Sequence, residues 1–187
     1  MSRFRVLGIL FAIAALGACS DAPQPRVWGA WADLINTSSV KIGDVQFAEE
    51  TKGGTGVVMR LQAWSLPAGR HGMHIHDSGL CDTPNFHNAG GHFNPFGKKH
   101  GLLNPEGPHA GDLPNLDVPS NGRVDITLNL PSVTLREGRH SLLQRNGTSF
   151  VIHANPDDGM SDPAGNSGAR IACGVIRSLN APGLETR

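Results

Sequence analysis

Short stretches in which apolar and polar residues alternate, separated by glycine and proline, restrict this chain of 187 residues to a β-sheet fold. In the clearest stretch, RVDITLNL at 123–130, every second residue is Val, Ile or Leu. Similar stretches lie at 40–47, 55–64, 149–154 and 169–176. No segment follows the 3.6-residue period of an amphipathic helix, and 24 glycines and 13 prolines provide many turns. The pattern predicts an all-β fold, a Greek-key β-barrel or sandwich of about eight antiparallel strands.

Two long segments between these stretches, 77–122 and 154–168, are rich in Gly, Pro, Asn and Asp and show little strand periodicity. Loops of this length are usually functional or disordered. The first segment holds four of the nine histidines, so we expect functional loops. The formal charge of the chain is zero, with 16 basic and 16 acidic residues, and we therefore expect no nucleic-acid partner.

The first 18 residues have the organisation of a secretory signal peptide. Arg3 and Arg5 precede an uncharged apolar run at 6–18, which is shorter than the about 20 residues of a membrane-spanning helix. The run ends in LGAC at 16–19, which resembles the lipobox of bacterial lipoproteins, where the cysteine is lipidated and becomes the mature N-terminus. An ordinary signal peptide followed by an incidental Cys19 is the alternative.

The lipoprotein interpretation divides the chain into a signal peptide at 1–18, a lipidated tether at 19–27, a folded domain at 28–180 and a C-terminal tail at 181–187. It predicts a periplasmic protein that is anchored to a membrane through its N-terminal lipid. The outer membrane is favoured, because Ser20 stands where an Asp would retain a lipoprotein in the inner membrane.

Two cysteines remain in the predicted domain, Cys81 and Cys173, 92 positions apart. Since the periplasm is oxidising, we expect them to form a disulfide. Two free, buried thiols are the alternative.

The histidines follow a spacing that suits metal ions. In a strand, His74 and His76 would point to the same face, while Ile75 would point into a core. Three histidines and an aspartate follow in the long loop: His92, His100, His109 and Asp112. Three imidazoles and one carboxylate suit a tetrahedral zinc site. His153, at the end of the apolar segment 150–153, is a further candidate for copper.

These residues resemble those of the copper/zinc superoxide dismutases. The matching stretches are HGMHIH at 71–76, GHFNP at 91–95, KHG at 99–101, HAGDL at 109–113, VIH at 151–153, DD at 157–158 and GNSGARIACGVI at 165–176. The resemblance covers about residues 28–180 and agrees in order, spacing and residue type. It implies conversion of superoxide to oxygen and hydrogen peroxide by redox cycling of copper, with one copper and one zinc ion in each chain.

The resemblance also implies a role for each matching residue. Copper would be held by His74, His76, His92 and His153, and zinc by His92, His100, His109 and Asp112. His92 would bridge the two metals and carry a proton during catalysis. Asp157 would link a copper ligand to a zinc ligand, and His71 would brace the backbone beside copper. Arg170 would dock the superoxide anion.

Three questions stay open at this point. The segment between His153 and Arg170 is shorter than in the eukaryotic enzymes and lacks their charged residues, which leaves steering of the anion by that loop in doubt. A non-catalytic copper-binding lipoprotein on the same fold is the alternative to an enzyme. A homodimer and a monomer are equally compatible with the sequence.

Overall fold

Every stretch predicted from alternating residues forms a strand in the computed structural model, which describes residues 27–50 and 56–179. The elements are β1 (Val27–Asn36), β2 (Lys41–Glu50), β3 (Val57–Ala63), β4 (Gly69–His71), β5 (Met73–His76), the 3-10 helix η1 (His87–Ala89), β6 (Leu116–Val118), β7 (Val124–Leu130), β8 (Thr148–His153) and β9 (Arg170–Ser178). The predicted signal peptide at 1–18, the lipidated Cys19 with nearly all of its tether, and the tail at 181–187 lie outside the described residues.

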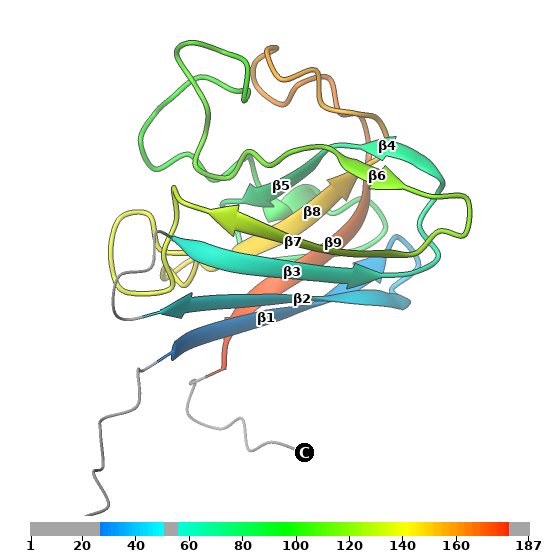
Figure 1. Ribbon diagram of the computed structural model, residues 1–187, viewed down its shortest axis with the longest axis horizontal. Coiled ribbons are helices and arrows are strands. Elements are labelled where there is room, and N and C mark those ends of the chain that lie inside the picture. Colours follow the sequence, from blue (N-terminus) through cyan, green and yellow to red (C-terminus); the bar gives the residue numbers. More distant parts are fainter. Residues whose placement is uncertain (1–26, 51–55, 180–187) are drawn as a thin grey trace, which may run out of the picture.

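Seven of these strands form one curled antiparallel sheet (Figure 1). Its strand order is β5-β8-β9-β1-β2-β3-β7, and β4 pairs with β6 in a separate two-stranded sheet. The chain crosses from the β7 edge to β8, near the opposite edge, which is a Greek-key type of connection. The prediction of an all-β, antiparallel fold is confirmed: the molecule is a curled half-barrel with a second, small sheet.

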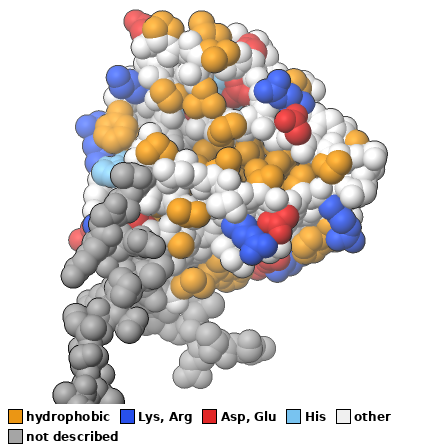
Figure 2. Space-filling view, in the orientation of Figure 1, with side chains coloured by type: hydrophobic (Ala, Val, Ile, Leu, Met, Phe, Trp, Pro, Cys, Tyr) orange, Lys and Arg blue, Asp and Glu red, His pale blue; other side chains and the backbone are white. Residues whose placement is uncertain are grey.

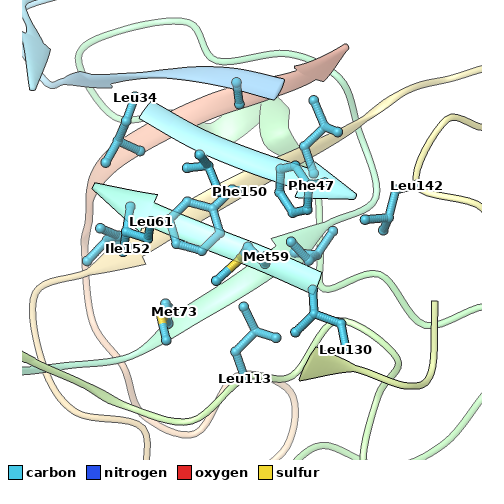
Figure 3. Packing of buried hydrophobic residues seen from close by; sticks show 14 of the residues in the cluster. Leu34, Phe47, Met59, Leu61, Met73, Leu113, Leu130, Leu142, Phe150 and Ile152 are labelled. Carbon is cyan, nitrogen blue, oxygen red and sulfur yellow. The ribbon is translucent and has the colours of Figure 1, made fainter. Parts of the chain in front are cut away.

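The hydrophobic core fills the concave side of the curled sheet. Along β3 the side chains alternate between buried and more exposed, so that Val57, Met59 and Leu61 all point inward. Phe150 and Ile152 of β8 meet them from the other half of the sheet, as Figure 3 shows. Each fully buried side chain of this size stabilises the fold by roughly 1.5–3 kcal/mol.

The segment 77–122 is more structured than its composition predicted, because it contains η1 and β6 and runs back along β5. Ile75 donates its N–H to Gly111 O (2.9 Å) and accepts from the N–H of Phe93 (2.8 Å). A side chain at position 111 would collide with Ile75 O, so this close approach requires glycine. The loop is therefore hydrogen-bonded along the strand that carries His74 and His76.

A disulfide joins the beginning of this loop to the sheet. Cys81 and Cys173 are bonded, with 5.7 Å between their Cα atoms, which confirms the predicted pair. Phe86 and Ala89 pack beside it in a small buried cluster of their own. The bond therefore ties the loop to β9, three residues beyond Arg170.

A third long connection, 131–147, is held to the sheet by one buried carboxylate. Glu49 of β2 is 2% exposed and accepts hydrogen bonds from Thr134 Oγ1 (2.7 Å) and from the Leu135 N–H (2.6 Å). It also forms an ion pair with Arg136. Burial alone would raise the pKa of Glu49, but these three partners outweigh burial and hold it below the usual value.

On the face shown in Figure 2, basic and acidic side chains lie close to one another, and hydrophobic side chains form a band between them. Within 27–50 and 56–179, no helix has the length and apolarity to cross a bilayer.

Candidate metal centre

Two strands bring three imidazole rings together at the edge of the curled sheet. His74 and His76 lie two positions apart on β5, as predicted, and His153 ends the neighbouring strand β8. The pairing of β8 with β9 shifts register between Ile152 and His153, an irregularity of the kind that re-aims a side chain. All three rings are buried. Their ligand atoms, together with one from His92, lie within 4.8 Å of one another.

The ring hydrogen bonds show which nitrogens are free to bind a metal. His76 donates from Nδ1 to Gly90 O and His153 donates from Nδ1 to Gly168 O, both at 3.1 Å. A carbonyl oxygen can only accept, so each ring carries its proton on Nδ1 and has a lone pair on Nε2. These two Nε2 atoms face each other at 3.4 Å. Two lone pairs at that distance repel unless a cation lies between them.

Two further nitrogens complete this first cluster. His74 donates from Nε2 to Asp157 Oδ2 (2.6 Å), and its Nδ1 is buried without a hydrogen-bond partner. His92 Nε2 is also buried and unpartnered. Buried polar atoms are rarely left unpaired, so four imidazole nitrogens directed at one point fit a bound metal ion. Imidazole is a ligand that copper accepts well.

The second cluster comes from the loop and is organised around one carboxylate oxygen. Three ring nitrogens lie close to Asp112 Oδ1: His92 Nδ1 at 3.0 Å, His100 Nδ1 at 3.1 Å and His109 Nδ1 at 3.3 Å. The other oxygen, Oδ2, accepts the N–H groups of Gly101 and His109, both at 2.9 Å. Burial alone would raise the pKa of Asp112, but its bonds to His109, His92 and Gly101 lower it far below the usual range. Three imidazoles and an ionised carboxylate match the donor set of zinc.

His92 belongs to both clusters, one ring nitrogen to each. Burial lowers the pKa of His92 to about 4 and that of His153 to about 3, and it also places the pKa of His76 well below 6.5. These rings are therefore neutral at neutral pH. Neutral imidazole is the form that binds metals.

Asp157 connects the two clusters. Its carboxylate accepts from His74 Nε2 and, at 3.1 Å from Oδ1, from His100 Nε2. Such a partner sets the tautomer and the orientation of a ligand ring. Gly165 has a φ of 60°, and a Cβ there would lie 2.0 Å from Asp157 Oδ1, so only glycine leaves room for this link.

Asn115 holds Asp157 in place and was not singled out in the sequence. It donates from Nδ2 to Asp157 O (2.8 Å) and accepts the Asp157 N–H at Oδ1 (2.7 Å). Asp162 similarly holds the segment 77–122 near His100, since it accepts the His100 N–H (2.7 Å) and pairs with Lys99 (3.0 Å). Only its position three residues after Asp112 could have drawn attention to Asn115.

Arg170 begins β9 beside the first cluster. It donates from Nη2 to Gly90 O and from Nη1 to Phe86 O, both at 2.5 Å, and Gly90 O also accepts from His76. A longer bond joins Nη1 to His87 O (3.3 Å). The Nε–H and one Nη2–H have no acceptor among the described residues. A guanidinium held by backbone carbonyls in this way can receive a small anion.

The remaining histidines lie outside both clusters. His71 is buried, and its ring nitrogens lie 2.8 Å from His153 O and 3.0 Å from Pro67 O, so it contacts the backbone beside the first cluster. His87 is exposed, and the ring of His140 lies 5.9 Å from that of Phe96. Neither belongs to one of the histidine clusters of the described residues.

Fold and donor set together define a class of protein: a β-sheet metalloprotein with two adjoining sites that share one imidazole. The family model described as copper/zinc superoxide dismutase matches residues 41–176. Superoxide dismutase [Cu-Zn] 1 of Aquifex aeolicus (strain VF5) is 51% identical over 148 residues, which cover 78% of this chain and 86% of that protein. The chain therefore belongs to the copper/zinc superoxide dismutase family.

Other relatives extend the similarity. Superoxide dismutase-like protein YojM of Bacillus subtilis (strain 168) is 36% identical over 195 residues, covering 96% of this chain and 98% of that protein. The crystal structure of a SOD-like protein from Bacillus subtilis matches with a TM-score of 0.75 and 41% identity, over 79% of this chain and 98% of that chain. The Cu/Zn superoxide dismutase from Brucella abortus matches with a TM-score of 0.63 at 26% identity.

Proposed function

We propose that this protein is a copper/zinc superoxide dismutase, which converts two superoxide anions and two protons to oxygen and hydrogen peroxide. The observation that carries the proposal is His92, whose two ring nitrogens belong to two different buried donor sets. Copper would be held by His74, His76, His92 and His153, and zinc by His92, His100, His109 and Asp112. When bound, copper supplies one-electron redox chemistry, and zinc supplies positive charge without redox chemistry.

The chain itself binds the anion and moves the proton. Arg170 receives superoxide through the N–H groups that its backbone acceptors leave free. Nε2 of His92 takes up and releases a proton, while Nδ1 of the same ring stays directed at Asp112. Asp157 keeps His74 and His100 in the tautomers that direct their Nδ1 atoms into the two clusters.

Metal analysis combined with a superoxide-competition assay on the purified protein tests the enzyme. We expect one copper and one zinc per chain and activity well above that of free copper. A protein with both metals but no more activity than free copper would refute the proposal. The same result would support the alternative, a copper-binding protein without catalysis.

Arg170→Ala separates these two functions further. A copper carrier has no need of this guanidinium, whereas the enzyme should lose roughly tenfold or more in rate, together with its salt dependence. The metal content should stay intact, since Arg170 contacts carbonyl oxygens and no ligand atom. Unchanged kinetics would count against its role in docking the anion.

We further propose that Cys19 carries lipid and anchors the mature chain in the periplasm, with the outer membrane favoured. The LGAC sequence, the preceding apolar run and the Cys81–Cys173 disulfide support this location. Cys19→Ser should release the protein from membranes in cell fractionation. Continued membrane association of this variant would refute the anchor.

A further inference from the structure

The outer face of the curled sheet changes from apolar to charged in three steps along its strands. The first row, at the edge where β1 begins, consists of Gly29, Ala48, Val58 and Asn129, which are cross-strand neighbours on β1, β2, β3 and β7. Leu179 lies over Gly29, to which it donates a backbone hydrogen bond of 2.9 Å. Val58 is 47% exposed and Leu179 is 54% exposed, so this row presents apolar side chains to the surroundings.

The second row combines an aromatic ring with two arginines. Trp31 is the cross-strand neighbour of Gln46 on β2, which in turn neighbours Arg60 on β3. On the other side of Trp31, the guanidinium of Arg177 lies 6.0 Å from the indole ring centre. A shallow groove of about 450 Å³ runs across these two rows.

The third row is acidic and its charges are paired. Asp33, Asp44 and Asp125 occupy it, with Gln62 between the last two. Lys41 pairs with Asp33 at 2.5 Å and with Asp44 at 2.6 Å, and Arg60 reaches across to Asp125 at 2.8 Å. Exposed ion pairs of this kind are hydrated, so we expect this row to stay in contact with water.

This sequence of rows matches the layers of a lipid–water interface. Aliphatic side chains suit the acyl boundary, and Arg suits the headgroup level, where its apolar stem and polar tip are both accommodated. The indole N–H of Trp31 is buried, so Trp31 presents only the apolar part of its ring to that level. Over the three rows Arg60, Arg177 and Lys41 balance Asp33, Asp44 and Asp125, so contact with lipid would depend on apolar burial more than on net charge. A face of this kind binds lipid weakly without a second attachment.

The position of the predicted anchor supplies that second attachment. β1 begins two residues before Gly29, and Ser20 to Arg26 reach at most about 25 Å, at roughly 3.5 Å per residue. The apolar row is therefore within reach of a membrane that holds Cys19. A short tether raises the effective concentration of the face at the bilayer, so that weak contacts are sufficient for binding. In Figure 1, β1 begins at the bottom and the loops that follow β5 and β8 lie at the top.

We propose that the face formed by Gly29, Trp31, Ala48, Val58 and Leu179, here called the docking face, enters the lipid–water interface of the anchoring membrane, with the row of Gly29, Ala48 and Val58 deepest. This inference rests on the proposed lipidation of Cys19. The docked orientation turns the metal clusters away from the bilayer and leaves them open to a soluble anion.

Fluorescence quenching of Trp31 tests the docking face. The chain contains three tryptophans, so Trp28→Phe with Trp64→Phe leaves Trp31 alone. The lipidated full chain is reconstituted into phosphatidylethanolamine–phosphatidylglycerol vesicles with brominated acyl chains. Burial by about 5–10 Å in the interface should reduce Trp31 emission roughly twofold relative to unbrominated vesicles. Val58→Asp should abolish this loss, whereas Gln62→Asp, on the same strand and face, should not.

A second single-tryptophan chain provides the control. Trp64 follows β3 beyond the acidic row, so a chain that retains only Trp64 should show no quenching. A vesicle-bound protein with unquenched Trp31 would overturn the docking face and leave the anchor intact. A protein that separates from the vesicles on flotation refutes the anchor, and the docking face with it. Dimers in detergent that Val58→Asp dissociates would assign the face to a second copy and overturn the proposal.

Discussion

The two metal clusters share one imidazole but are built in different ways. Three of the four rings of the copper cluster, those of His74, His76 and His153, project from paired strands. The second nitrogens of His76 and His153 are bound by backbone carbonyls, Gly90 O and Gly168 O. The zinc cluster comes from a loop, and one carboxylate, Asp112, holds its parts together. Strand pairing fixes the positions of those three copper ligands, whereas the zinc ligands depend on contacts made within the loop. Changes that loosen the loop should therefore affect zinc more than copper.

Removing the disulfide should have the largest effect on stability. Replacing Cys81 and Cys173 with alanine opens a cross-link between residues 92 positions apart, which is worth about 4.6 kcal/mol in the chain-entropy model. Denaturant unfolding of the metal-free protein should show this loss. Because the bond ties the loop to β9, zinc binding should weaken more than copper binding. Equal losses for both metals, measured by competition with chelators, would contradict the contrast between strand and loop.

Asp112→Ala should break the loop cluster alone. The change leaves the Nδ1 atoms of His92 and His100 and two backbone N–H groups without the carboxylate they share, at a cost of about 3 kcal/mol. Metal analysis should find copper retained and zinc lost. Asp117→Ala is the matched control, since that carboxylate is 84% exposed on β6 and should change neither metal. Copper loss equal to zinc loss in Asp112→Ala would show that the strands do not hold their ligands unaided.

Asp157→Asn tests the connection between the clusters. An amide nitrogen cannot accept a hydrogen bond, so one of the two rings, His74 or His100, loses its acceptor. We expect roughly a 10–100-fold loss of zinc affinity and a smaller loss for copper, because β5 still orients His74. Asn115→Ala should act in the same direction but less strongly, and Asn129→Ala, on the outer face of β7, should have no effect. A larger loss of copper affinity than of zinc affinity would contradict this prediction.

Acid should produce the smallest effect on stability. It acts on the connection 131–147, which Glu49 holds to the sheet. Because the pKa of Glu49 in the folded protein lies below its usual value of 4.5, its contribution to stability is complete above that pH. The contribution is lost as the pH falls through the lower, folded-state pKa. Unfolding free energies of the native chain and of Glu49→Gln should differ by a constant amount from pH 7 to 5 and converge below about pH 4.5. A difference that does not change below pH 4.5 would contradict this account of Glu49.

The strands and much of the metal centre were accessible from the sequence. Alternation located β2, β3, β7, β8 and β9, and the spacing of His74 and His76 placed both rings on one face. The strands β1, β4 and β6 were not predicted, and the three residues of β4 and of β6 are too few to show a period. Asn115 was missed because it acts on the backbone of Asp157, which no side-chain pattern encodes.

Local order along the chain was sufficient for an all-β fold, because side-chain period is a local property. The sets of metal ligands were implied by the resemblance of short stretches to the copper/zinc superoxide dismutases, and the cysteine pair was expected from the oxidising periplasm. The ring nitrogen that each histidine directs at the metal is set by a hydrogen-bond acceptor that lies elsewhere in the chain. His74 depends on a carboxylate 83 residues away, and His153 depends on a carbonyl 15 residues away across a loop. The rows of the outer sheet face likewise exist only through strand register, since Gly29, Ala48 and Val58 become neighbours when β1, β2 and β3 pair. Such contacts join residues that only the folded chain brings together.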